Sequence, residues 1–468
     1  MALREERAKP KRKQVANRHN RRAGNKSYWR RVASRVDAVA VSKLQLGNES
    51  RMKRTVTMFI VSMTLAATLV AQGPPPGKDE ALGKLLTSGK LADAERQLMA
   101  DLAVKPDDAT RMTLGMTKFL RAIEDYSRRL RRFGLNHRSS VIGNVPFFRI
   151  PVPPHPNPLP VRPEDLRATF AKLVNDLDAA EAALASIQGA DWKVVVRVEQ
   201  LQLNIADDNE EAVMLPIVDL LNIAGFAPRG GTREPPAEIV VAFDKADSIW
   251  LRGYCRLVQS LAEVVLTFDA KELFDHSAHL AFAKPVGKFP FLQGANSKEF
   301  DTNWIIDGIA FIHMLRVPVK EPERLKSAHG HLLQMLSLSG KMWDEILAET
   351  DNDREWIPSP KQKGAIPNIV VNEAMVGTWR EFLSEAQALL EGKKLAPFWR
   401  DTADAQGVRG INVKRVFHEP QMFDLVLWFQ GTAAVPYLEK GPTTSPAVWT
   451  RFSEIFQGRF MTFFVWWN

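Results

Sequence analysis

The sequence predicts a mainly α fold: a helical array or repeat-like bundle with a few short strands. Apolar residues recur every three or four positions in most segments beyond residue 78, which is the period of an amphipathic helix. Capping residues, prolines and glycines stand at the ends of several of these segments, where helices begin and end. Strand character is confined to short stretches: 196–203 alternates apolar and polar residues, 410–417 is a second candidate, and 237–243 fits either state.

The segment 52–71 has the three parts of a secretory signal peptide. Lys53 and Arg54 are basic, residues 56–70 are uncharged and largely apolar, and Ala71 supplies a small residue for cleavage. Threonine and serine dilute the apolar run, whereas a spanning helix needs about 20 apolar residues. We therefore predict a periplasmic or secreted protein with no integral membrane span after cleavage. An uncleaved anchor is the alternative.

Residues 1–51 form a basic extension that is predicted to be disordered, because it has few large apolar residues. Residues 1–54 contain 17 of the 63 Lys and Arg residues but only 4 of the 54 Asp and Glu residues. The remaining 46 basic and 50 acidic residues leave the body without excess positive charge, so it is not expected to bind nucleic acid. The extension is either a cytoplasmic arm or an untranslated segment upstream of a true start at Met52.

Residues 79–143 are predicted to form a repeat-like helical region. Apolar residues at helical spacing indicate two helices within 79–108 and a longer amphipathic helix over 109–133. The arginines at 128–132 are interpreted as the solvated C-terminal face of that helix, where positive charge complements the helix dipole.

The first two helices resemble one tetratricopeptide repeat. Packing residues, a tight turn, a small crossing residue and a terminating proline fall at Leu85, Gly89, Ala94, Leu98 and Pro106. The resemblance covers only residues 79–108 and implies a pair of antiparallel helices. Asp101 stands where a second small residue is expected, and no second copy follows, so a generic helical hairpin is the alternative.

Residues 144–163 are predicted to be a proline-rich strap over the helices or a linker. Eight prolines between 146 and 163 require extended or polyproline II backbone. The remaining residues, 164–468, are predicted to form a helical body, either undivided or dividing near 350–368.

The body contains several well-marked helical segments. The segment 244–268 is apolar around most of its circumference and is predicted to be a central buried helix, and 303–317 is interpreted in the same way. The further expected helices are 163–187, 325–347 with a possible break at Gly340, 372–391, parts of 423–438, and 445–456. The last nine residues are so apolar that they must be buried, cover a partner or aggregate.

Linear catalytic motifs are missing from the chain. The sequence has no GxSxG, HExxH, Walker A or strand-associated GxGxxG motif. Cys255 is the one cysteine, so an intramolecular disulfide is excluded, and its apolar surroundings favour a buried thiol. The acidic stretch 204–211 lacks the ligand pattern of a calcium loop and is interpreted as a solvated turn.

The strongest candidate metal ligands are Asp275, His276 and His279. If residues 271–280 are helical, these side chains and Glu272 share one side of the helix. Two imidazoles and a carboxylate suffice for a zinc or iron site with an open position. The alternative is an ordinary polar helix face with no cofactor.

The sequence favours an exported helical binding or structural protein of the bacterial cell envelope, with no evident catalysis. The expected partner is a protein or an envelope component. Two alternatives stand. The first is a metal-dependent exported hydrolase that uses Asp275, His276 and His279. The second is a carbohydrate-binding protein, because nine of the 12 tryptophans lie at or after Trp304 and tryptophan stacks on sugar rings.

Overall fold

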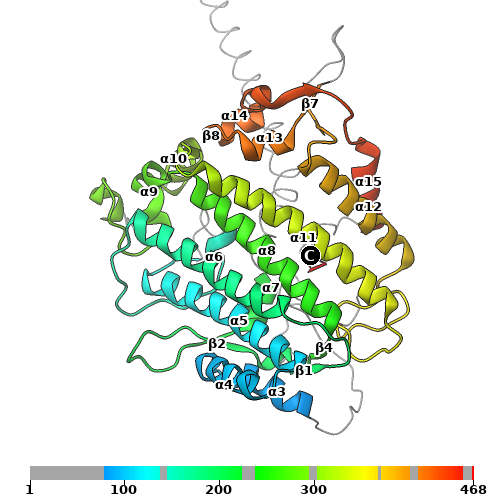
Figure 1. Cartoon of the computed structure of the whole chain (residues 1–468). Helices are drawn as coiled ribbons and strands as arrows, with labels where there is room; N and C mark the ends of the chain where they lie inside the picture. The colour runs from blue at the N-terminus through cyan, green and yellow to red at the C-terminus, as the bar shows by residue number, and fades with distance from the viewer. Residues whose placement is uncertain are drawn as a thin grey trace, which may run out of the picture. The chain divides into compact units, whose positions relative to one another are not determined.

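The computed structural model describes residues 78–137, 145–223, 238–294, 303–366, 370–400, 409–456 and 466–467. The fold is mainly α with a few short antiparallel strands, which confirms the predicted fold class (Figure 1). None of the helices in these ranges combines the length and the apolar character needed to cross a membrane. The predicted signal at 52–71 and the basic extension lie outside the described residues.

The described chain begins with three consecutive helices: α3 (Lys78–Thr87), α4 (Leu91–Val104) and α5 (Asp108–Arg132). Gly89 has a φ of 68° between α3 and α4, a conformation that glycine adopts without steric cost. Gly83 lets α3 approach the sheet, because a Cβ there would lie 1.9 Å from the Val195 carbonyl oxygen. The helices expected within 79–108 and over 109–133 are therefore present.

Four long helices lie side by side in the order α5, α6, α8 and α11 (Figure 1). They span Asp108–Arg132, Pro163–Ala185, Lys245–Thr267 and Pro322–Ala348. Helix α8 is central and buried as predicted, with Asp244 as its N-cap. Helix α11 continues through Gly340, where the sequence suggested a break. A Cβ atom added to Gly340 would have no other atom within 4 Å.

Shorter helices complete the fold: α7 (Ile217–Ile223), α9 (Lys271–Ser277), α10 (Asn303–Met314), α12 (Glu373–Leu390), α13 (Val413–His418), α14 (Leu425–Gln430) and α15 (Pro446–Ile455). The Asn372 side chain caps α12 and the Ser445 side chain caps α15, as the sequence predicts.

The strands pair locally. Strand β1 (Val194–Arg197) pairs with β4 (Val240–Phe243), β2 (Gln202–Asn204) with β3 (Met214–Pro216), and β5 (Arg316–Val317) with β8 (Phe423–Asp424). Strands β6 (Ala396–Pro397), β7 (Arg409–Ile411) and β9 (Leu438–Lys440) form a small sheet with β7 in the middle. The ambiguous segment 237–243 thus contains a strand, whereas the strand expected over 410–417 ends at Ile411 because Asn412 caps α13.

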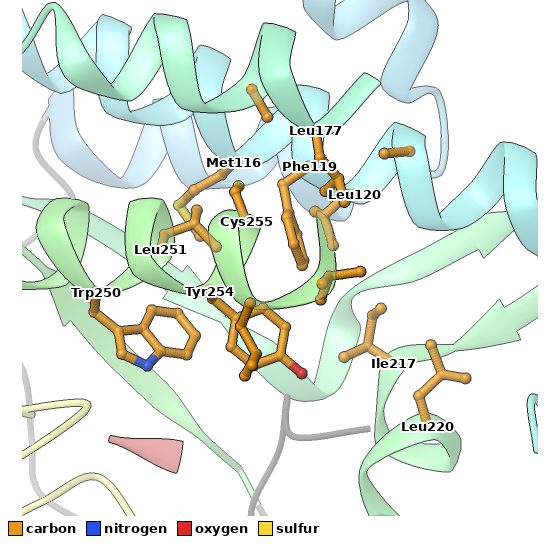
Figure 2. Packing of buried hydrophobic residues seen from close by; sticks show 14 of the residues in the cluster. Met116, Phe119, Leu120, Leu177, Ile217, Leu220, Trp250, Leu251, Tyr254 and Cys255 are labelled. Atoms are coloured by element: carbon orange, nitrogen blue, oxygen red, sulfur yellow. The ribbon is translucent and has the colours of Figure 1, made fainter. Parts of the chain in front are cut away.

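One continuous apolar core joins the first helices to the end of the chain. Figure 2 shows part of it, where Met116, Phe119 and Cys255 pack between α5 and α8. Trp466 and Trp467 belong to the same core and are almost completely buried. The Trp250 indole donates a hydrogen bond to the Trp466 carbonyl (2.8 Å), and the Ser339 hydroxyl donates to the Trp467 carbonyl (3.0 Å). The two C-terminal tryptophans are therefore core residues.

The proline-rich segment lies against the helices. The Leu159 amide donates to the Arg132 carbonyl at the end of α5, and the Val161 amide donates to the Lys284 carbonyl beyond α9. Val152 and Val161 are buried. These contacts are those of a strap; residues 138–144 lie outside the described ranges.

Candidate functional site

The three predicted metal ligands lie in two different elements. Helix α9 ends at Ser277, so Asp275 and His276 are helical but His279 lies in the following 3-10 turn, Ala278–Leu280. The shared helical face that the spacing predicts therefore does not extend to His279.

Each of these side chains contacts a different neighbour. Asp275 accepts hydrogen bonds from the Lys271 ammonium (2.7 Å) and from the Lys288 backbone amide (3.0 Å). The His276 ring centroid lies 4.7 Å from that of Phe289, and His279 Nε2 lies 3.3 Å from an oxygen of Asp307 on α10. The three do not bring their ligand atoms within 4.8 Å of one another. The metal site remains a prediction from the sequence.

A different trio of carboxylates converges at one end of α8 and α11. Within the described ranges, Asp244, Glu349 and Glu355 place one oxygen each within 4.8 Å of the others. Asp244 precedes α8, Glu349 follows α11, and Glu355 lies in the loop beyond α11. Four acids alternate along 349–355, a local signal for this cluster, but Asp244 joins them only through the packing of α8 on α11.

The carboxylates of this cluster resist ionisation. Burial raises the pKa of Glu349 to about 8, and the negative charge of Asp244 acts in the same direction. Burial also raises the pKa of Asp244 and of Glu355, although the nearby Lys193 ammonium opposes both shifts. Burial raises the pKa of Asp247 well above its usual range, reinforced by Asp244. Carboxylates cluster here in excess of cations.

Hard cations such as calcium and magnesium are ligated by oxygen atoms in such an arrangement. The same carboxylates also have structural roles. Asp244 accepts from the Ala246 amide at the start of α8, Glu349 accepts from the Gln362 side chain, and Glu355 accepts from the Asp353 amide. These hydrogen bonds hold the helix ends and the loop together without needing a ligand.

The arginines at 128–132 and the acidic stretch 204–211, both interpreted as solvated from the sequence, form ion pairs with each other. Arg131 is buried at the end of α5 and donates two hydrogen bonds of 2.7 Å to Glu210. Arg132 donates to Asp207 (2.8 Å), so the acidic turn closes over the arginines. The solvated interpretation fails for Arg131, because partners about 80 residues apart cannot be recognised from local sequence. Asp208, Asn209 and Glu211 in the acidic turn are exposed, as that interpretation expects.

The described part of the core contains a small apolar cavity. A cavity of about 40 Å³ lies among Leu120, Tyr126, Phe147, Leu220 and other apolar side chains. It is far smaller than the ~150 Å³ apolar cavity that accommodates benzene. Figure 2 shows how Leu220 and Tyr254 lie in this part of the core.

The largest departure from expectation is α10, which is not a buried helix. Ile305, Ile309 and Ile312 recur at spacings of four and three and are about half exposed to solvent, and Ile306 beside them is 60% exposed. Met314 lies on the opposite, buried face. Apolar residues around a helix therefore do not reveal which face the fold leaves uncovered.

Helix α14 continues this exposed apolar surface. Strand β5, just after α10, pairs with β8, just before α14, and the Leu425 amide donates to the Leu315 carbonyl (2.9 Å). Val426, Leu427 and Phe429 are exposed on α14. We call the exposed residues of the two helices the α10–α14 surface: Ile305, Ile306, Ile309, Ile312, Val426, Leu427 and Phe429.

Exposed apolar side chains are concentrated around this surface. Of 19 large apolar residues exposed on the described chain, ten lie within 286–312 and 422–429, so they are gathered rather than scattered. Figure 1 shows α9, α10 and α14 at the same end of the long helices. Concentrated apolar exposure of this kind marks interaction sites in folded proteins.

No protein-family model, no curated protein and no solved structure matches the chain.

Proposed function

We propose that the chain is an exported helical protein of the bacterial cell envelope that acts by binding a partner. The signal-like segment 52–71 supports export. The missing linear catalytic motifs and the small interior cavity favour binding over catalysis. The observation that carries the proposal is the α10–α14 surface, since burying exposed isoleucine and phenylalanine stabilises a complex in water.

Export is tested by following the full chain in a bacterial host. We expect the protein in the periplasmic or extracellular fraction, with an N-terminus at Gln72 by mass spectrometry. Leu65→Arg combined with Leu69→Arg places charge in the apolar run and should hold the protein in the cytosol. Leu65→Ile is the matched control and should leave export unchanged. Intact wild-type chain in the cytosol alone would contradict the proposal.

The hydrolase alternative makes a separate prediction. Stoichiometric zinc or iron in the purified protein, lost when His276 and His279 are both changed to alanine, would favour it. Asp275 would then complete the ligand set. A metal-free folded protein with no hydrolytic activity would support binding.

Carbohydrate binding has one supporting feature. Among the described tryptophan side chains, Trp399 is the one that is largely exposed, at 55%. Most others pack in the core; Trp379, for example, lies against Phe382 with ring centroids 5.1 Å apart. Quenching of tryptophan fluorescence by cell-wall glycans, abolished by Trp399→Ala, would favour this alternative.

A further inference from the structure

We propose that the α10–α14 surface docks on the headgroup region of an anionic lipid bilayer. This inference rests on the proposed function, which places the folded body in the cell envelope. It names the partner of that surface as a membrane rather than a protein.

The geometry of α10 suits a helix that lies along a membrane. Its 12 residues extend about 18 Å, well short of the ~30 Å hydrocarbon core. Ile305, Ile309 and Ile312 form one stripe, while Met314 on the opposite side is buried in the protein. An exposed apolar stripe on a helix backed by protein is the arrangement of an interfacial helix.

Two exposed cations lie at the margin of the surface and could meet anionic headgroups. Helices α10 and α14 contain a single carboxylate, Asp307, and it is paired with His279 at 3.3 Å. Arg316, two residues after α10, is exposed and stands opposite Asp424 in the β5–β8 pair. Lys288 is exposed next to α9, which packs on α10, and its ammonium lies 5.5 Å from the centroid of the Phe289 ring. Neither has an ion pair with a described residue. Lysine and arginine beside an apolar face attract acidic lipids.

Aromatic side chains near Lys288 lie beside the α10–α14 surface. Phe291 is 74% exposed, close to Phe289, whose ring lies 4.7 Å from His276 of α9. Phenylalanine at such a position inserts between headgroups and acyl chains.

A second copy of the chain fits this surface less well. In a two-fold contact the same patch meets itself, so the cations at the margin of one copy would face the margin of the other. The exposed aliphatic side chains also offer no hydrogen bonds to fix a register, whereas protein interfaces contain about one per 100–200 Å². A bilayer requires neither a register nor a complementary shape.

Vesicle sedimentation tests the proposal with the protein in the form that accumulates in the cell. Vesicles of phosphatidylethanolamine with phosphatidylglycerol are compared with vesicles of phosphatidylcholine. We expect sedimentation with the anionic vesicles and weaker sedimentation with the neutral ones. Ile306→Gln with Ile309→Gln should weaken binding to both about tenfold or more, because two exposed apolar groups no longer insert. Lys288→Gln with Arg316→Gln should remove the preference for anionic lipid, a loss of about tenfold.

The matched control is Val104→Gln with Val370→Gln, which removes two exposed valines far from α10 in the sequence and should leave binding unchanged. All these positions are exposed, so circular dichroism should confirm that each variant folds. Two results would overturn the proposal. One is wild-type protein that sediments with neither vesicle. The other is a dimer, detected by light scattering, that the Ile306 and Ile309 substitutions dissociate.

Failure of this inference is distinguishable from failure of the proposed function. Export is read from the fraction and the N-terminus of the product, independently of lipid. If the protein is exported but does not bind vesicles, the membrane proposal is wrong and the proposed function still stands. If the protein stays in the cytosol, the proposed function is wrong, whether or not the protein binds vesicles.

Discussion

At the scale of single residues, the most consequential feature is the crowding of buried carboxylates around Asp244, Glu349 and Glu355. Their three oxygens lie within 4.8 Å of one another, and Lys193, whose charge opposes the raised pKa values of Asp244 and Glu355, is hydrogen-bonded to Asp351. Burial raises the pKa of Glu349 to about 8, and the repulsion between like charges, which protonation of one member relieves, acts in the same direction.

This crowding predicts a stability that depends on pH. Glu349 ionises near pH 4.5 in the unfolded chain but near pH 8 in the folded one, so its contribution to folding stability is complete below about pH 4.5 and is lost as the pH rises through 8. Glu349→Gln should flatten this dependence, raising the melting temperature at pH 9 relative to the wild type. Calorimetry at pH 5, 7 and 9 measures it. Glu345→Gln, four residues earlier in α11, is the control: Glu345 is ion-paired with Lys245 and lies outside the carboxylate cluster, and an equal effect of both substitutions on the pH dependence would contradict the explanation.

At the scale of elements, α13 is held on α11 by a histidine pair. His329 Nε2 donates to the Leu390 carbonyl (2.8 Å), so its Nδ1 is free to accept from His418 Nε2 (3.2 Å). If both imidazole rings were protonated, an N–H group of each ring would point at the other, and the hydrogen bond between them would be lost. Burial lowers the pKa of His418, as does the neighbouring His329. The charged groups facing this histidine are Lys414, Lys326 and Glu323.

Acidification should therefore loosen α13. The lowered pKa of His418 means that the unfolded form takes up its proton first, so stability is lost as the pH falls through about 6.5. Hydrogen exchange of the α13 amides should accelerate between pH 7.5 and 5.5. His418→Gln should weaken this pH dependence. His313→Gln, at an exposed histidine of α10, should preserve it; unchanged exchange in the wild type would contradict the mechanism.

The C-terminal tryptophans join α11, α12 and α15. The Trp467 ring lies 4.7 Å from Trp343, 5.5 Å from Trp379 and 5.4 Å from Phe456 between centroids. Trp467→Ala should reduce the free energy of unfolding by about 3–5 kcal/mol, because it leaves a large cavity in a packed core. Urea denaturation measures the loss. Trp399→Ala, at an exposed tryptophan, should change it by less than about 0.5 kcal/mol.

At the scale of the whole molecule, one large apolar cluster contains buried residues from Leu82 to Trp467, and a small separate cluster forms around Ile411, Ala434 and Tyr437. Trp356 lies within 350–368, where the sequence leaves a division of the body open, and its ring centroid is 5.3 Å from that of Trp250 in the central helix. A shared core couples the unfolding of the elements that line it.

The body is therefore expected to unfold in a single transition. Near-ultraviolet circular dichroism, which reports the buried tryptophans, and far-ultraviolet circular dichroism, which reports the helices, should give coincident melting curves. Two separated transitions would show that the chain divides, as the alternative near 350–368 predicts.

The sequence predicts those structural features that depend on interactions between residues close together in the chain. Asn372 and Ser445 cap helices through contacts with residues two or three positions away, so their roles were readable from the sequence. The pairing of Arg131 with Glu210 and of Arg132 with Asp207 was not predicted, because it depends on packing. The repeat resemblance at residues 79–108 and the export signal stay predictions.

The amino-acid sequence by itself determined the helical class, most helix boundaries and the burial of Cys255, because periodicity, capping and apolar content act within a few turns of chain. Tertiary structure alone decided that α10 presents its isoleucines to solvent and that Asp244 meets Glu349 and Glu355. Both outcomes depend on which elements become neighbours, and contacts between residues far apart in the chain set that choice.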